Sequence, residues 1–265
     1  MSTQSDAKSV NSAISEKAPE LQAPEGLVVH LQRGVVDPVS GEWQVEAEIR
    51  EMTGADEEYL ASIQSKDGVT YSEYMSALLR RTVVRIGTLS VEDSPSIVDT
   101  VIIGDRDMLF LGVIKATYGS ERMFVSRCPH CSKLNDISID LNEDFPVATP
   151  SVDLRTPLTK KLRNGSIVKL RLPNAADSAY VGKRATSVAA QNTLMLARCS
   201  VWDEDNRPGD TEEWAKSLGV ADRNNLVNAL LSVEAGPSME GVNIQCAHCK
   251  EEISIVLDWI SLLLS

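Results

Sequence analysis

Four cysteines form two Cys-x-x-Cys pairs, Cys128-Pro-His-Cys131 and Cys246-Ala-His-Cys249, in a chain of 265 residues. Two intervening residues let one tight turn aim both sulfurs at one ion, and four thiolates suit tetrahedral zinc. The spacing therefore predicts one Zn²⁺ ion bound by Cys128, Cys131, Cys246 and Cys249. Because four cysteines fill the coordination shell, no position remains for water or substrate, and the predicted role of the metal is structural.

The two pairs are far apart along the sequence. The 114 residues between Cys131 and Cys246 greatly exceed the loop of a zinc finger that folds alone. The metal must therefore join segments that the rest of the fold brings together. Apolar residues alternate at residues 123–125 and 137–141 around the first pair, and at residues 242–244 and 253–257 around the second. This period of two predicts that each pair lies on a bend between two strands.

Two other roles compete with zinc binding by four cysteines. His130 and His248 lie within the pairs and could each replace a sulfur, but a ring between two ligating cysteines usually points outward. Cys-Pro-His-Cys is also an active-site sequence of thiol-disulfide oxidoreductases, in which the first cysteine is acidified at a helix N-terminus. Residues 132–136 lead into a strand pattern instead, which favours the metal. The fifth cysteine, Cys199, belongs to no motif and is predicted to be a small buried side chain.

The elements around the cysteines are predicted to be short. Turn residues predict hairpins over residues 27–49 and over residues 158–172, the second around Asn164-Gly165. Further helical patterns are expected at residues 53–64, 174–188, 211–218 and 222–233. The predicted fold class is therefore α+β, with mixed helices, short antiparallel strands and a four-cysteine, zinc-ribbon-like site that closes the domain.

Two more helices have recognisable ends. Thr70 and Glu73 have the spacing of a capping box, and apolar residues continue from there at helical intervals as far as Gly87. Asp105 is expected to cap another apolar helix, which should end at Gly119 and lead into the first cysteine pair.

Composition limits the domain organisation and the location. Residues 1–25 are polar and aperiodic and are predicted to be a disordered tail, followed by a single zinc-binding domain at residues 26–265 in which residues 158–236 form an insert. The first residues lack an apolar leader, and no apolar run approaches the roughly 20 residues of a membrane helix. We expect a cytoplasmic protein with no membrane partner, and the sequence leaves the oligomeric state open.

The sequence lacks the residue sets of common enzymes. Of three histidines, two lie within the cysteine pairs and the third, His30, lies on a strand pattern. Phosphate-binding, dinucleotide-binding and metalloprotease motifs are missing from the sequence. We therefore expect no enzyme activity, and we identify no catalytic and no cofactor-binding residues apart from the metal ligands.

A basic stretch offers an alternative function, that of a zinc-ribbon regulator that binds nucleic acid. Its residues are Arg155, Lys160, Lys161, Arg163, Lys169 and Arg171. The formal net charge of −12 and the lack of interleaved aromatic residues oppose this alternative. A solvated hairpin face is the simpler interpretation.

The order of motifs resembles a known family, the T4-type phage baseplate hub assembly proteins, also called tail assembly chaperones, of contractile tails and related injection systems. The similarity covers about residues 45–264. Its features are residues 49–53 before an acidic helix, Gly104-Asp105-Arg106 opening a helix that ends at Tyr118-Gly119, both cysteine pairs, and residues 165–173 as a strand that runs into a proline. Ser132 and Lys250 stand where this family usually has glycine.

The resemblance implies a non-enzymatic protein that binds tail or baseplate hub components in the host cytoplasm while the particle forms, and that can remain as a component of the virion. The C-terminal residues 259–264 are apolar. They are expected to pack on the core of the protein itself, with docking on a partner as the alternative.

Overall fold

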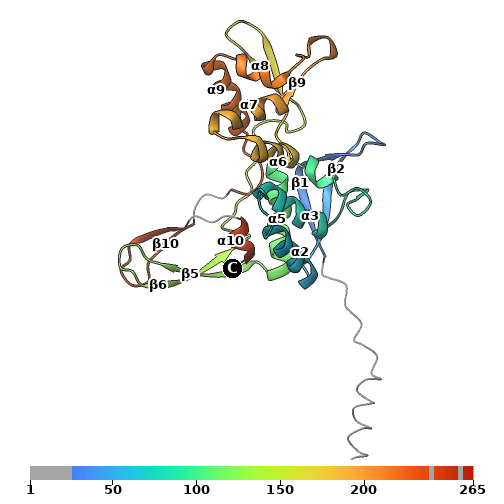
Figure 1. The fold of residues 1–265 in the computed structure, drawn as a ribbon. Coiled ribbons are helices and arrows are strands. Elements are labelled where there is room, and N and C mark those ends of the chain that lie inside the picture. The colour runs from blue at the N-terminus through green and yellow to red at the C-terminus, as the bar shows by residue number, and fades with distance from the viewer. Residues whose placement is uncertain (1–25, 239–241, 256–258, 265) are drawn as a thin grey trace, which may run out of the picture.

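The computed structural model describes residues 26–238, 242–255 and 259–264. The predicted tail at residues 1–25 lies outside these described residues. Figure 1 shows an elongated molecule, with α2 near one end, helices α7, α8 and α9 at the other, and an arm that contains β5, β6 and β10 at the side. Helices are mixed with short antiparallel strands, which confirms the predicted fold class.

A four-stranded antiparallel sheet and the helices around it form the first part of the fold. The strands are adjacent in sequence order: β1 (Gly26–Val36), β2 (Trp43–Arg50), β3 (Val83–Ile86) and β4 (Leu89–Ser90). The helices are α2 (Gly54–Gln64), α3 (Tyr71–Thr82), α4 (Ile97–Thr100) and α5 (Ile103–Tyr118). Helix α5 packs against β1 and β2, and most of its residues are buried.

A smaller sheet and its helices form the other end of the molecule. The sheet has the order β7 (Leu158–Lys161), β8 (Ile167–Leu170) and β9 (Ser200–Val201). The helices are α6 (Ala175–Arg184), α7 (Val188–Cys199), the 3₁₀ turn η1 (Glu204–Asn206), α8 (Thr211–Ser217) and α9 (Val220–Leu231). Helices α3 and α6 pack together and join the two parts.

Two hairpins make up the arm. They are β5 (Glu121–Arg127) with β6 (Leu134–Asp140), and β10 (Val242–Gln245) with β11 (Glu252–Ile255). The short C-terminal helix α10 (Trp259–Leu264) returns to the body beside α5 (Figure 1). Its residues Trp259, Leu262 and Leu263 are buried in the main core, which confirms the prediction that this segment packs on the protein itself.

The order of elements in residues 26–140 recurs in residues 158–255, and we call these two segments the first and the second repeat. Elements β1-β2-α2-α3-β3-α4-α5 of the first repeat correspond to β7-β8-α6-α7-β9-α8-α9 of the second, whereas strand β4 and the turn η1 have no equivalent. The hairpin β5-β6 corresponds to β10-β11. Helices α3 and α7 are both 12 residues long, and each follows a hydroxyl N-cap, Thr70 or Ser187, whose side chain accepts a backbone N–H.

Strand register supports this correspondence residue by residue. Three strand pairs of the first repeat have an equivalent in the second. They are, with the pair of the second repeat in parentheses, Leu27–Ile49 (Leu158–Leu170), Val29–Ala47 (Lys160–Val168) and Ile49–Val83 (Leu170–Ser200). The hairpin of the first repeat has extra residues at its tip, where the pairing shifts between His30 and Val35. Gly34 and Gly165 mark equivalent bends, with φ of 75° and 89°, which glycine adopts without strain.

The two repeats also bury equivalent side chains, each in its own hydrophobic cluster. Equivalent buried residues are Ile49 and Leu170, Leu79 and Leu196, Val98 and Ala215, Leu109 and Leu226, and Val113 and Leu230. Since these positions lie on β2, α3, α4 and α5 and on their counterparts, the same packing arrangement is built twice. Aliphatic side chains dominate both clusters, in line with the 5% aromatic content.

A buried carboxylate ties the strand to the helices in the first repeat. Asp56 is fully buried and accepts hydrogen bonds from Arg50 Nη1 at 2.7 Å, Arg81 Nε at 2.5 Å and the backbone N–H of Thr53 at 2.9 Å. The guanidinium of Arg81 also lies over the ring of Tyr59, 4.7 Å from its centroid. Burial alone would raise the pKa of Asp56, but the arginine and backbone hydrogen bonds outweigh it and hold the pKa well below its usual range.

The second repeat contains the same arrangement around Asp177. This fully buried carboxylate accepts from Arg171 Nη1 at 2.6 Å, Arg198 Nε at 2.8 Å and the backbone N–H of Asn174 at 3.0 Å. Arg198 lies over the ring of Tyr180, 4.8 Å from its centroid. The arginine, the aromatic ring and the capping residue therefore all have equivalents in the first repeat.

Three predicted helix boundaries were wrong. Helix α3 ends at Thr82 and does not reach Gly87, because the β-branched Val83 starts strand β3 and pairs with Ile49. Helix α5 begins at Ile103, before Asp105. The helix predicted over residues 174–188 ends at Arg184, and a separate helix, α7, begins after Ser187 and was missed.

Asp105 has a different role from the predicted cap. It is fully buried, and its carboxylate accepts the backbone N–H groups of Gln32 at 2.6 Å, Arg33 at 3.0 Å and Gly34 at 2.8 Å. The carboxylate therefore fixes the bend in β1 against the start of α5. The second repeat has an equivalent contact, in which the backbone N–H of Arg163 donates to Asp222 at 3.2 Å.

Candidate metal centre

The structure brings the four predicted cysteines together at the end of the arm. The sulfur atoms of Cys128, Cys131, Cys246 and Cys249 all lie within 4.8 Å of one another, and none forms a disulfide. Cys128 Sγ is 3.7 Å from Cys249 Sγ, and Cys131 Sγ is 3.6 Å from Cys246 Sγ. A tetrahedral Zn²⁺ with bonds of about 2.3 Å separates its sulfurs by about 3.8 Å. The sulfur positions therefore fit a single tetrahedral metal ion.

Each cysteine pair is shaped by a tight turn. Cys128 donates its backbone N–H to Lys133 O at 2.9 Å, and Ser132 donates to Cys128 O at 2.9 Å. The second turn repeats this pattern, with Lys250 donating to Cys246 O at 3.0 Å. Ser132 and Lys250 have φ of 59° and 67°, a left-handed conformation that glycine adopts at least cost. Glycine would therefore be the least strained residue at both positions.

Backbone N–H groups favour sulfur anions here, whereas burial opposes them. Cys128 and Cys246 are almost completely buried, whereas Cys131 and Cys249 are half-buried. The backbone N–H of Cys249 and then that of His248, which is 3.4 Å from Cys246 Sγ, lower the pKa of Cys246 to about 5. At Cys249 the backbone N–H of Glu251 also favours the anion, but burial and the neighbouring sulfurs outweigh it and raise the pKa to about 12. Four sulfur atoms this close together could all carry a negative charge only with a cation bound between them.

The two histidines stay outside the sulfur cluster. Both His130 and His248 are exposed, and neither belongs to the group of potential ligands found among the described residues. His248 Nε2 lies 3.2 Å from Leu134 O, and Asn135 Oδ1 accepts the backbone N–H of Ala247 at 2.9 Å. These polar contacts join the two hairpins beside the sulfurs.

The surroundings of Cys128 differ from those of an oxidoreductase cysteine. The turn after Cys128 continues into strand β6, so no helix N-terminus faces the sulfur from this segment. The other predicted thiol, Cys199, is fully buried, and burial raises its pKa to about 12. This confirms that Cys199 is a buried side chain with little thiolate character.

The predicted basic stretch does not form one continuous face. Arg171 turns inward to Asp177, and Arg155 lies over the ring of Trp43, 5.1 Å from its centroid. Lys169 Nζ is 3.8 Å from an Asp203 oxygen. Only part of the stretch is therefore available for the nucleic-acid contact that the alternative function requires.

One signal of the repeat is present in the sequence and was missed. Arg50, Thr53 and Asp56 have the same spacing as Arg171, Asn174 and Asp177. This Arg-x-x-(Thr/Asn)-x-x-Asp pattern marks the entry to α2 and to α6, and it would have revealed the repeat. The consequence for the metal centre is direct, because each repeat supplies one cysteine pair.

The fold and the cysteine cluster are those of an α+β protein in which a cluster of four sulfur atoms joins two structural repeats. In a comparison with known protein families, residues 36–264 match the family described as T4 bacteriophage base plate protein. The protein belongs to this family, and hence to the structural proteins of phage tails.

Other comparisons gave no match. No curated protein and no solved structure matches this sequence. None of the helices that the structure describes combines the length and the apolar character needed to cross a membrane.

Proposed function

We propose that the protein is a non-enzymatic assembly protein of a phage tail baseplate, or of a related contractile injection system, that acts by binding tail or baseplate hub proteins as an assembly chaperone. The observation that carries this proposal is the family match over residues 36–264. Binding takes place in the host cytoplasm while the particle forms, and the protein can remain in the finished virion.

The four cysteines hold one structural Zn²⁺ in this proposal. The support is the fit of the sulfur spacing to tetrahedral zinc and the burial of Cys128 and Cys246. The metal joins the two repeats so that residues 26–265 act as one domain, with residues 158–236 between the two cysteine pairs. No open coordination position is left for catalysis, which is why we propose no enzyme activity.

A pull-down from producing cells tests the assembly role. Tagged wild-type protein is expected to recover tail or baseplate proteins, identified by mass spectrometry. The control variant Cys199→Ser, which removes a buried sulfur outside the metal centre, should recover the same proteins as the wild type. Recovery of no tail or baseplate protein by the wild type would contradict the proposed function.

The metal is tested separately. Elemental analysis of protein purified under reducing conditions should find about one zinc per molecule, and Cys246→Ser should lower both zinc content and stability, because zinc binding is coupled to folding. Cys199→Ser should retain the zinc. Protein that is folded and free of zinc would refute this part of the proposal.

A further inference from the structure

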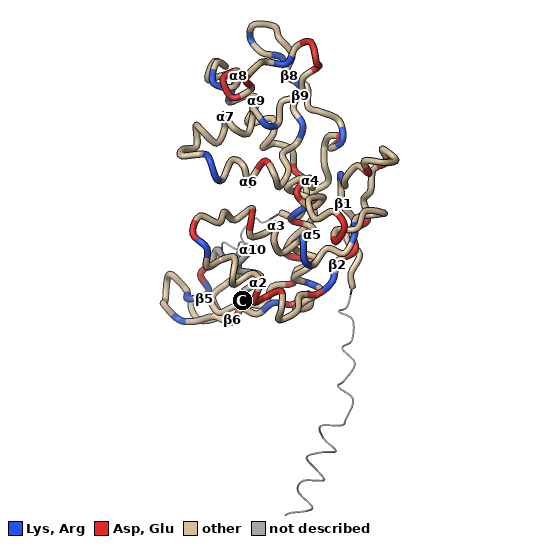
Figure 2. Tube along the Cα trace, turned by 45° about the vertical axis from the view of Figure 1, so that its right-hand side comes forward, with Lys and Arg blue, Asp and Glu red and all other residues tan. Residues whose placement is uncertain are grey.

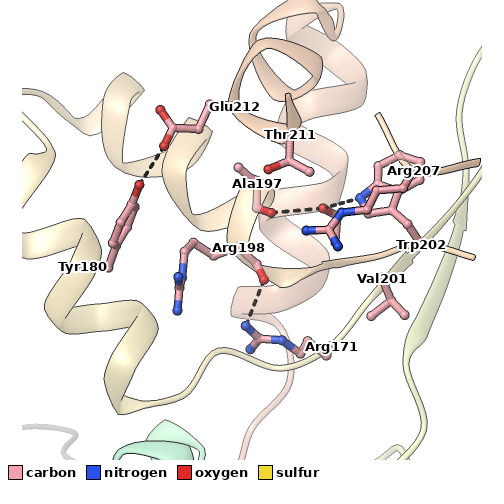
Figure 3. Close-up of a pocket in the computed structure, with 10 residues that line it drawn as sticks. Arg171, Tyr180, Ala197, Arg198, Val201, Trp202, Arg207, Thr211 and Glu212 are labelled. Atoms are coloured by element: carbon pink, nitrogen blue, oxygen red, sulfur yellow. Dashed lines mark hydrogen bonds between the residues drawn. The ribbon is translucent and has the colours of Figure 1, made fainter. Parts of the chain in front are cut away.

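An arginine-lined pocket lies at the far end of the molecule from the metal centre. It has a volume of about 560 Å³, between helices α6, α7 and α8 and the segment after β9. Figure 3 shows Arg171, Arg198 and Arg207 reaching it from three different segments. Tyr180 and Trp202 also line the pocket. A space of this size accommodates a side chain or a short peptide segment.

Two of these arginines keep unused hydrogen-bond donors. Arg198 donates through Nε to Asp177 at 2.8 Å, and its two terminal nitrogens donate to no residue that the structure describes. Arg207 is exposed and forms no hydrogen bond or ion pair within the described part of the protein. Both terminal nitrogens of Arg171, in contrast, donate to Asp177 and to the carbonyl groups of Leu172 and Arg198. The pocket therefore presents two guanidinium groups with free donors.

The single carboxylate on the wall already has partners. Glu212 Oε1 accepts the hydroxyl of Tyr180 at 2.8 Å and lies 3.5 Å from Arg184 Nη2. It therefore neutralises Arg198 and Arg207 only in part. Positive charges around one cavity repel each other, and an anion bound between them relieves this repulsion.

The first repeat provides an internal comparison. There Arg81 also donates to Asp56 and stacks on a tyrosine, so this part of the arrangement is structural. Trp202 corresponds to Arg85, which forms an ion pair with Glu48 at 2.7 Å, and Arg207 corresponds to Ser90. The second repeat has thus gained an unpaired arginine beside the shared one. Figure 2 shows charges of both signs in this repeat, which has twelve Lys and Arg and twelve Asp and Glu.

We propose that this pocket binds an acidic segment of a partner protein, whose Asp or Glu carboxylates accept hydrogen bonds from Arg198 and Arg207. The planar guanidinium forks suit the two oxygens of a carboxylate, and Trp202 offers an apolar wall for the methylene groups of the bound segment. That the occupant is a protein rests on the proposed role in assembly. The carboxylate chemistry rests on the pocket alone.

The test is a titration of the full-length protein with a capped hexaglutamate peptide. NMR signals of the arginine Nε–Hε groups and calorimetry report binding, and the signals of Arg198 and Arg207 should shift. Arg207→Ala should weaken binding about 10-fold or more, since a charge-assisted hydrogen bond is lost. Arg163→Ala removes an equal charge from the exposed hairpin tip of the same repeat and should change affinity less than about 2-fold.

Further variants sharpen the result. Glu212→Gln should tighten binding, because it removes a competing negative charge while an amide oxygen still accepts the hydroxyl of Tyr180. Unfolding curves check that Arg207→Ala remains folded. Equal losses in Arg207→Ala and Arg163→Ala, or equal binding of hexaglutamine, would overturn the proposal. Inorganic phosphate that shifts the two arginine signals at concentrations at which the peptide does not would also overturn it.

The pocket and the proposed function can fail separately. If a tail or baseplate partner is recovered equally well by Arg207→Ala and by wild type, and the peptide does not bind, the pocket assignment is wrong and the assembly role stands. If the peptide binds through Arg207 but no tail or baseplate protein is recovered from producing cells, the carboxylate site stands and the assembly role is wrong.

Discussion

Asp177→Asn should destabilise the protein by about 3 kcal/mol. The carboxylate is fully buried and accepts two hydrogen bonds from Arg171, one from Arg198 and one from the backbone of Asn174. Removing one partner of a buried ion pair costs about 3–5 kcal/mol. The value belongs at the lower end because the side chains of Arg171 and Arg198 are 32% and 36% exposed and stay partly hydrated. An asparagine amide group would also face a guanidinium donor.

Urea unfolding, followed by circular dichroism and by tryptophan fluorescence, measures this loss as a lower midpoint at constant slope. Asp56→Asn is the matched variant in the first repeat and should cost a similar amount, since Asp56 has equivalent partners. Glu48→Gln is the control: its ion pair with Arg85 is exposed, so about 1 kcal/mol or less is expected. A loss below about 1 kcal/mol for Asp177→Asn, or one equal to that of Glu48→Gln, would refute the reasoning.

The same substitution should change the response to acid. Burial alone would raise the pKa of Asp177, but the hydrogen bonds from Arg171 and from the backbone of Asn174 outweigh it and lower the pKa below its usual value. A carboxylate with a lowered pKa in the folded state adds stability at pH above its unfolded pKa of about 4. This stability is lost as the pH falls through the folded value. The difference between wild type and Asp177→Asn should therefore shrink below about pH 4.

Three other predictions concern the metal turns, the packing of α10 and the carboxyl group of Asp107 on helix α5. Ser132→Gly and Lys250→Gly should each leave the zinc bound and raise the thermal unfolding midpoint slightly. The reason is that both residues have a left-handed backbone conformation, which glycine adopts at lower cost than a residue with a side chain. A lower midpoint would contradict this. Trp259→Ala should cost about 3–5 kcal/mol in urea unfolding, because Trp259 packs in the main core; loss of partner binding at unchanged stability would favour the docking alternative. Burial raises the pKa of Asp107 to about 6. The stability of the wild type relative to Asp107→Asn should therefore fall as the pH rises from about 4 through about 6. Stability profiles of the two proteins that run parallel over this pH range would exclude the effect.

Local signals in the sequence predicted the elements that local interactions decide. The capping box of Thr70 and Glu73, the turn at Asn164-Gly165 and the stop at Gly119 all occur in the structure. The end of α3 was mispredicted because Val83 continues the helical period while its actual partner, Ile49, lies far away in the sequence. The periodicity of a short sequence window cannot reveal a strand partner that lies more than 30 residues away, as Ile49 does from Val83.

The clustering of the four cysteines was largely predictable, and the arginine pocket was not. Two Cys-x-x-Cys pairs imply a metal wherever the fold brings them, because the ligand types and their spacing carry the chemistry. The pocket depends on Arg198 and Arg207, which come from different segments and share no motif. The repeat was also hidden, since Arg81 follows Asp56 by 25 residues whereas Arg198 follows Asp177 by 21, so that no fixed period runs through the sequence.

The division of the four cysteines between two repeats has a consequence for the stoichiometry of metal binding. A protein with one repeat would contain a single Cys-x-x-Cys pair. It could complete a tetrahedral four-sulfur zinc site only by sharing the ion with a second copy. Such a dimer would dissociate on dilution, whereas two linked repeats meet at a fixed effective concentration. Linkage also lets the halves differ in charge: the first repeat has 11 Lys and Arg against 18 Asp and Glu, while the second is balanced. The molecule is in this sense a dimer within one polypeptide, with one cysteine pair from each half in a shared cluster and with halves that can face different neighbours.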